Sequence, residues 1–121
     1  MKTRSYLLAI DGSQASRSAA QFAWDLAKQT DSVVVAQHVV DTTEIWRFLS
    51  YDLAGFIGSG LYMDAREQIT AVMYSIAEAL MLSYGSQAEG QSIRFENYID
   101  EGEPAAEIAR RAADHDLVIL G

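Results

Sequence analysis

The fold class follows from the stretch Tyr6-Leu7-Leu8-Ala9-Ile10-Asp11-Gly12-Ser13 near the N-terminus. Its first five residues form a continuous apolar run, which is typical of a strand buried on both faces of a parallel sheet. The Asp-Gly-Ser that follows is turn-forming and ends the strand. Beyond the turn, apolar residues recur at helical spacing: Ala19, Phe22, Ala23, Leu26 and Ala27. A strand, a turn and an amphipathic helix in this order indicate an α/β fold.

Strands and helices continue to alternate along the chain. Residues 33–40 are β-branched and mostly apolar, residues 93–99 alternate apolar and polar side chains, and residues 117–120 are apolar. A helical period returns from residue 64, and another helix follows Pro104. The first of these helices should bury Ile69, Val72, Met73, Ile76 and Leu80 and end at Gly85; the second should bury Ala105, Ile108, Ala109 and Ala112. The whole pattern predicts an open parallel sheet with right-handed crossovers.

The chain is expected to form one domain over residues 1–121, since this length supports an ordinary hydrophobic core and little more. Residues 41–63 show no persistent period and mix Trp46, Phe48, Tyr51 and Phe56 with three glycines. We therefore predict an irregular lid or long connection there. The alternating pattern of residues 93–99 predicts a strand at the edge of the sheet, where one face is wet.

Composition excludes several classes of function. Because the chain has no cysteine, it has neither disulfides nor thiolate metal sites. The net charge is −8, and residues 61–121 carry four basic against eleven acidic side chains, so binding to nucleic acid is not expected. No apolar run is long enough for a membrane span, and the N-terminus lacks the pattern of a signal peptide, which predicts a cytoplasmic protein without membrane contacts.

Candidate functional residues lie after the strands, because open parallel sheets bind ligands beyond the carboxyl ends of their strands. Asp11 is the sharpest of them: its carboxylate could accept hydrogen bonds from a ribose, lie near a metal, or simply cap the turn into the first helix. Either Ser13 or Ser16 could cap that helix. Of the two histidines, His38 is expected to be hydrogen-bonded within the core, and His115 to be structural. No catalytic constellation, phosphate-binding P-loop or metal-ligand spacing is present, so we predict neither catalytic nor metal-binding residues.

Three segments together resemble the universal stress protein family. They are residues 7–13 with the following Ser16, Ala19, Ala20 and 23–27, then His38-Val39-Val40, and finally residues 101–108 continuing through 116–121. The resemblance implies a Rossmann-like sheet of the adenine nucleotide alpha hydrolase-like type, with strand order 3-2-1-4-5. It also implies a stress-response role, binding of ATP or a related adenine nucleotide with Mg²⁺, and a homodimer or tandem-domain partner.

The resemblance also assigns site residues by matching position. Ala9, Ile10 and Asp11 would line the nucleotide, with the Asp11 carboxylate toward the ribose. Val39 would offer its backbone to the adenine. Leu120 and Gly121 would begin the opposite wall.

One feature departs from the family pattern. Nucleotide-binding members continue past the final glycine with a Gly-x2-Gly-x9-Gly-Ser/Thr loop, a helix and a fifth strand, of which this sequence holds only Gly121. We therefore expect a C-terminally incomplete domain with strand order 3-2-1-4, weak ATP binding at best, and at most slow ATP hydrolysis in a complete form. The leading hypothesis is a non-enzymatic nucleotide-binding regulatory module that acts through partner contacts. The alternative is an interaction or dimerisation module of the same fold that binds no nucleotide.

Overall fold

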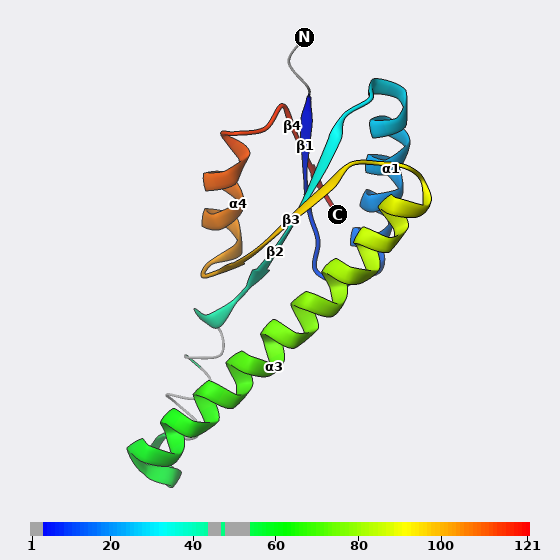
Figure 1. Ribbon diagram of the computed structural model, residues 1–121. Coiled ribbons are helices and arrows are strands. Elements are labelled where there is room, and N and C mark those ends of the chain that lie inside the picture. The colour runs from blue at the N-terminus through cyan, green and yellow to red at the C-terminus, as the bar shows by residue number, and fades with distance from the viewer. Residues whose placement is uncertain (1–3, 44–46, 48–53) are drawn as a thin grey trace.

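The computed structural model describes residues 4–43, 47 and 54–121, and of residues 54–62 it describes the backbone (Figure 1). The elements are β1 (Ser5–Ala9), α1 (Gln14–Thr30), β2 (Val33–Val40), α3 (Ala54–Gly90), β3 (Phe95–Glu101), α4 (Pro104–Ala112) and β4 (Leu117–Leu120). All strand pairs are parallel, and the sheet has the order β3-β2-β1-β4. The predicted α/β class, the open parallel sheet and the strand order are thus confirmed, with β3 at an edge as its alternation indicated.

The helices cover the two faces of the sheet unequally. In Figure 1, α1 and α3 lie on one face and α4 lies on the other. This division follows from right-handed crossovers between strands in the order β3-β2-β1-β4. The main core forms under α1 and α3, and no residue of α4 is fully buried. The α4 face of the sheet is therefore the more open one.

Helix α1 packs on the sheet through small side chains and one large one. Ala19, Ala23 and Ala27 are buried as predicted, whereas Phe22 is 56% exposed, so its place in the expected stripe was wrong. Trp24 is buried instead: its indole Nε1 donates to Gln87 Oε1 at 3.2 Å, and its ring centroid lies 6.1 Å from that of Phe95. The alanines bring the helix close to the sheet, and the tryptophan fills the space between α1, α3 and β3.

Helix α3 is longer than the sequence indicates. It begins at Ala54, so residues 54–63 are helical and not irregular as predicted; residues 44–46 and 48–53 of that segment lie outside the described part. Nor does the helix end at Gly85, because it continues to Gly90. A Cβ at Gly85 would lie 3.4 Å from Cε1 of Phe95, so this glycine packs directly against the ring. Gly85 therefore lies where α3 packs on β3, and not at the end of the helix.

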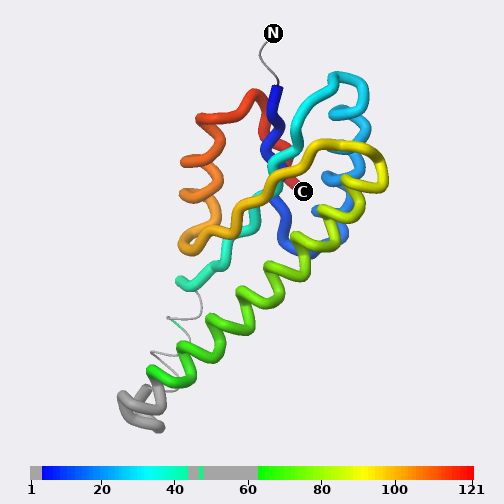
Figure 2. The backbone as a smooth tube through the Cα atoms, in the orientation of Figure 1, coloured from blue at the N-terminus to red at the C-terminus, as the bar shows by residue number. Residues whose placement is uncertain are grey.

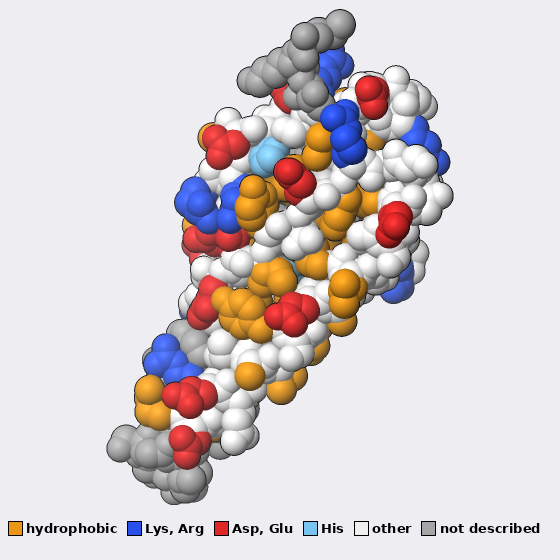
Figure 3. Space-filling view, viewed as in Figure 1, with side chains coloured by type: hydrophobic (Ala, Val, Ile, Leu, Met, Phe, Trp, Pro, Cys, Tyr) orange, Lys and Arg blue, Asp and Glu red, His pale blue; other side chains and the backbone are white. Residues whose placement is uncertain are grey.

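The buried face of α3 also differs from the prediction. Val72 and Ile76 are 58% and 56% exposed. The residues that reach the core come from the last part of the helix: Ala77, Met81, Tyr84 and Ala88, with Leu80 partly buried beside them. Figure 2 shows that the first half of α3 extends past the end of the sheet. Next to Ile76 the helix already contacts the core, since Ala77 is fully buried, so Ile76 lies on the face that points away from it. On the face seen in Figure 3, acidic side chains are spread along the length of the molecule, with apolar side chains between them.

Candidate functional site

A cavity of about 580 Å³ opens at the carboxyl ends of β1, β2 and β4, on the face of the sheet covered by α4. Its lining comprises Ala9, Ile10, Asp11, Ser16, Gln37, Val39, Pro104, Ala105, Ile108, Ala109, Leu120 and Gly121. All six residues that the family resemblance assigned to a ligand site are among them. The ends of three strands therefore form the floor of the cavity, and α4 forms the wall that faces it.

The floor of the cavity is a row of paired residues across the sheet. Ala9 pairs with Gln37 of β2 on one side and with Leu120 of β4 on the other. Side chains alternate along a strand, so Val39 lies on the same face as Gln37. Because the central position of the row carries only a methyl group, space remains above it for a ligand.

Asp11 sits at the mouth of the cavity in a tight turn. Its Oδ1 accepts hydrogen bonds from Ser13 N at 2.9 Å and Ser16 Oγ at 2.7 Å, and its own backbone N–H donates to Ser16 Oγ at 3.0 Å. Gly12 adopts φ +85°, which favours glycine at this point of the turn. Ser13 caps α1, since its hydroxyl accepts from Ser16 N at 3.1 Å. The turn-forming role of Asp11 is therefore real, and the choice between Ser13 and Ser16 falls on Ser13.

The electrostatics of this turn keep Asp11 ionised. Hydrogen bonds from Ser13 and Ser16 lower the pKa of its carboxyl to about 2. Asp11 is exposed, and the hydrogen bonds found among the described residues fall on Oδ1. A carboxylate held this way presents its second oxygen, Oδ2, as an acceptor toward hydroxyl groups of a ligand.

Gln37 brings a buried polar network to the floor. Its side chain is 1% exposed, and its Nε2 donates to Asp100 Oδ2 at 2.8 Å and to the backbone oxygen of Glu107 at 3.1 Å. Asp100 is held in turn by Arg111, whose Nη2 donates to Oδ1 at 2.7 Å. The hydrogen bond from Arg111 lowers the pKa of Asp100. Sequence analysis missed Gln37 as a site residue, although one amide within an apolar strand was a signal.

Gly121 closes the cavity against the start of α1. A Cβ at this position would collide with the backbone of Ala15 and Ser16. The glycine therefore allows the end of β4 and the first turn of α1 to approach closely, next to Asp11.

The histidines have structural partners, as predicted. His38 Nδ1 lies 2.8 Å from the carbonyl oxygen of Ile10, to which it donates, although the ring is only half-buried. His115 Nδ1 lies 2.9 Å from Ser5 Oγ. Among the described residues there is no group of three or more His, Cys, Asp or Glu that could hold a metal ion, and no helix able to cross a membrane.

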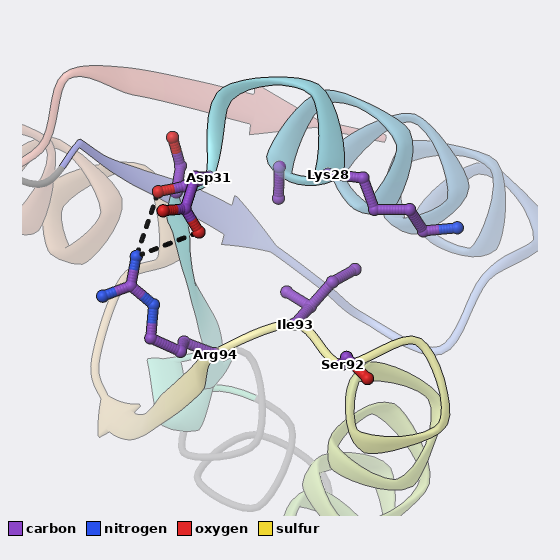
Figure 4. Close-up of a pocket in the computed structure, with 7 residues that line it drawn as sticks. Lys28, Asp31, Ser92, Ile93 and Arg94 are labelled. Carbon is purple, nitrogen blue, oxygen red and sulfur yellow. Dashed lines mark hydrogen bonds and ion pairs between the residues drawn. The ribbon is translucent and has the colours of Figure 1, made fainter.

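A smaller pocket of about 180 Å³ lies at the opposite ends of the strands, where β2 and β3 begin (Figure 4). Its lining includes Lys28, Asp31, Ser92, Ile93 and Arg94. Arg94 Nη2 donates to the backbone oxygen of Asp31 at 3.0 Å and lies 3.6 Å from its Oδ1. This guanidinium already joins the two walls of the pocket. The pocket is therefore a less favourable ligand site than the larger cavity.

The family model described as "Universal stress protein family" matches residues 3–121. The chain belongs to the universal stress protein family. Among solved structures, this universal stress protein is similar to the universal stress protein UspA from Lactobacillus plantarum, with a TM-score of 0.77 and 18% identity over 100% of this chain and 78% of that chain.

Two further similar structures have a nucleotide bound. A universal stress protein family protein from Arabidopsis thaliana with AMP bound has a TM-score of 0.65 and 12% identity, over 98% of this chain and 76% of that one. A universal stress protein in complex with cAMP has a TM-score of 0.52 and 13% identity, over 95% of this chain and 69% of that one. At these identities the likeness shows the fold of this universal stress protein. No curated protein matches its sequence.

Proposed function

We propose that this universal stress protein binds an adenine nucleotide in the cavity between the strand ends and α4, and that occupancy changes its contacts with partners during stress. The observation that carries the proposal is the convergence of Ala9, Ile10, Asp11, Val39, Leu120 and Gly121 on one cavity of about 580 Å³. A cavity of this size is typical of small-molecule sites. Similar folds described with AMP and cAMP support the same ligand class.

The chemistry of the cavity suits a nucleoside. Apolar side chains of the floor and of α4 offer a surface for a purine ring, and the backbone of Val39 offers hydrogen bonds to its edge. The ionised Asp11 carboxylate is an acceptor for the ribose hydroxyls. Among the described residues that line the cavity there is no histidine that could act as a base for a nucleophile, and the described part of the chain holds no group that could bind a metal ion. The proposed role is binding and regulation without a catalytic step.

The phosphates should contribute less than the nucleoside. The described lining of the cavity contains no Lys or Arg, and Asp11 is itself negative. We therefore expect AMP and ATP to bind with similar affinities, and Mg²⁺ to accompany the phosphates of ATP. A homodimer or tandem-domain partner and a cytoplasmic location remain part of the proposal.

Isothermal titration calorimetry tests the proposal with AMP, and with ATP in the presence and absence of Mg²⁺. Asp11→Asn preserves an acceptor for the turn but removes the charge, and it should weaken AMP binding several-fold. Arg94→Ala, in the small pocket at the opposite ends of the strands, is the matched control and should leave binding unchanged. Failure of the wild-type chain to bind any of these nucleotides would contradict the proposal and favour the interaction module instead.

A further inference from the structure

A groove of about 570 Å³ lies between the second half of α3 and the strand β3. We call it the β3 groove; its apolar lining consists of Met81, Leu82, Gly85, Phe95 and Ile99. The side chain of Leu82 is 74% exposed there. Strand β3 lies in front of the other strands in Figure 1, and on the same face in Figure 3 apolar side chains are exposed between acidic ones. An apolar hollow that is open to solvent is typical of an interaction site.

The backbone of β3 has a free edge beside this groove. Val34 N donates to the backbone oxygen of Arg94 at 3.0 Å, and in a parallel ladder every second residue of a strand faces the same neighbour. The N–H and C=O groups of Phe95, Asn97 and Ile99 therefore point away from β2. Strand β3 is the last in the order β3-β2-β1-β4, so no described strand pairs with these groups. Such an edge can bind an extended segment of another chain through backbone hydrogen bonds.

The groove fits the side chains of a strand added at this edge. The side chains of Phe95, Asn97 and Ile99 belong to its lining. Side chains alternate along a strand, so every second residue of the added segment would enter the groove. There it would meet the apolar side chains of β3 and the exposed Leu82 of α3. The inward residues of the segment should therefore be apolar.

The charge of the groove indicates what flanks these apolar residues. Glu78 and Glu89 are the first and last residues that α3 contributes to the lining, and the lining contains no described Lys or Arg. Both carboxylates are exposed, and none of the ion pairs found among the described residues involves them. The helix between them spans roughly 16 Å, which an extended chain covers in about five residues. A segment with Lys or Arg on either side of its apolar residues matches this spacing.

The same charges oppose binding of a second copy of this chain. The net charge of the protein is −8. Pairing of β3 with the β3 of another copy would bring two acidic rims together, and like charges across an interface disfavour association. A basic partner meets no such repulsion.

We propose that the β3 groove binds an extended segment of a basic partner protein. The segment adds a strand to β3, places apolar side chains beside α3, and pairs its Lys or Arg side chains with Glu78 and Glu89. The inference does not depend on nucleotide binding, because the β3 groove and the cavity at the strand ends share no lining residue.

The test is a titration of the full chain with the capped peptide Lys-Thr-Val-Thr-Val-Thr-Lys, followed by backbone amide resonances. The valines and lysines of this peptide share one face of an extended strand. The amide resonances of Phe95, Asn97 and Ile99 should shift, with an affinity that falls as salt is added. The same peptide with Glu in place of both Lys should bind at least about ten-fold more weakly.

Variants separate the charges from the strand edge. Glu78→Gln combined with Glu89→Gln should weaken binding of the lysine peptide about three- to ten-fold, since two exposed ion pairs are lost. Asp25→Asn combined with Asp114→Asn removes two exposed carboxylates outside the groove and is the matched control, with an affinity within about two-fold of wild type. Asn97→Pro removes one outward N–H, which the edge of a sheet tolerates, and should weaken binding at least about ten-fold.

Equal affinities for the two peptides, or shifts that spare residues 95–99, would overturn the inference. So would a dimer in sedimentation equilibrium that Asn97→Pro dissociates, because the groove would then bind a second copy. If Asn97→Pro does not fold, the double glutamine variant and its control decide: equal affinities of these two for the lysine peptide would overturn the inference. The proposed function stands in each case, since no nucleotide takes part.

Discussion

Replacing Asp11 by asparagine should lower the stability of the protein at neutral pH and leave it nearly unchanged in acid. Hydrogen bonds from Ser13 and Ser16 lower the pKa of this carboxyl from 3.8 to about 2. At about 1.4 kcal/mol per pH unit, a shift of this size corresponds to roughly 2.4 kcal/mol as an upper limit. Asp11 is exposed, and solvent screening reduces the expected contribution to about 1 kcal/mol.

The dependence on pH has a definite sign. Because the pKa is lower in the folded state, the stabilisation is fully present above the unfolded value near 4 and is lost as the pH falls through about 2. Urea unfolding followed by circular dichroism at several pH values measures it. The free energies of unfolding of wild type and Asp11→Asn should differ by about 1 kcal/mol at pH 7 and converge between about pH 4 and pH 2.

Asp25→Asn is the matched control, since Asp25 is an exposed carboxylate on α1, the helix that follows the Asp11 turn, and it accepts a hydrogen bond from Gln21. It should leave the unfolding free energy within about 0.5 kcal/mol of wild type. A difference for Asp11→Asn that stays constant down to pH 2, or none at pH 7, would refute the reasoning about this turn.

Three further substitutions test the packing around the site and the core. Ala9→Leu fills the centre of the cavity floor and should reduce AMP binding more than about ten-fold by calorimetry, with the far-ultraviolet circular dichroism spectrum unchanged; wild-type affinity would show that the ligand lies elsewhere. Gly85→Leu forces a side chain against the Phe95 ring and should cost about 1–3 kcal/mol in urea unfolding; a gain in stability would mean that the ring yields freely. Trp24→Ala should cost about 3–5 kcal/mol, because the indole is 1% exposed; a loss below about 1 kcal/mol would contradict its place in the core.

The sequence predicts the sheet well because its buried parallel strands are continuous or nearly continuous apolar runs. Residues 6–10, 33–40 and 117–120 are such runs, and each corresponds to a strand that differs from it by at most one residue at either end. The alternating run 93–99 becomes the edge strand β3. The rule that ligands bind at the carboxyl ends of strands indicates Asp11, Val39 and Gly121, and the family resemblance adds Ala9, Ile10 and Leu120. All six residues line one cavity.

Helix faces and helix length are predicted less well because tertiary packing decides them. Trp24 lies outside the predicted apolar stripe of α1. It is buried nonetheless, because its indole packs against the ring of Phe95 and contacts helix α3. In α3, the apolar positions Val72 and Ile76 are exposed whereas Ala77 is fully buried, so the helix turns a different face to the core than its apolar period indicates. The glycine-rich start of the same helix, from Ala54, has a composition that ordinarily disfavours helix.

The polar part of the site is hidden from sequence for a different reason. Gln37 and Asp100 lie 63 residues apart in the chain, and the pairing of β2 with β3 and the crossover through α4 bring them together. A local pattern cannot reveal such a contact. The apolar strand 33–40 contains only one amide, and a buried amide requires partners; that much could have directed attention to Gln37.

The central claim, that an adenine nucleotide occupies the cavity at the strand ends, is tested most directly by following backbone amide resonances during titration with AMP. The amide resonances of Asp11, Val39 and Leu120 should shift together with a single affinity, while those of Ser92 and Arg94 at the small pocket stay in place. Shifts confined to residues 92–94, or no shifts at AMP concentrations up to several millimolar, would contradict it.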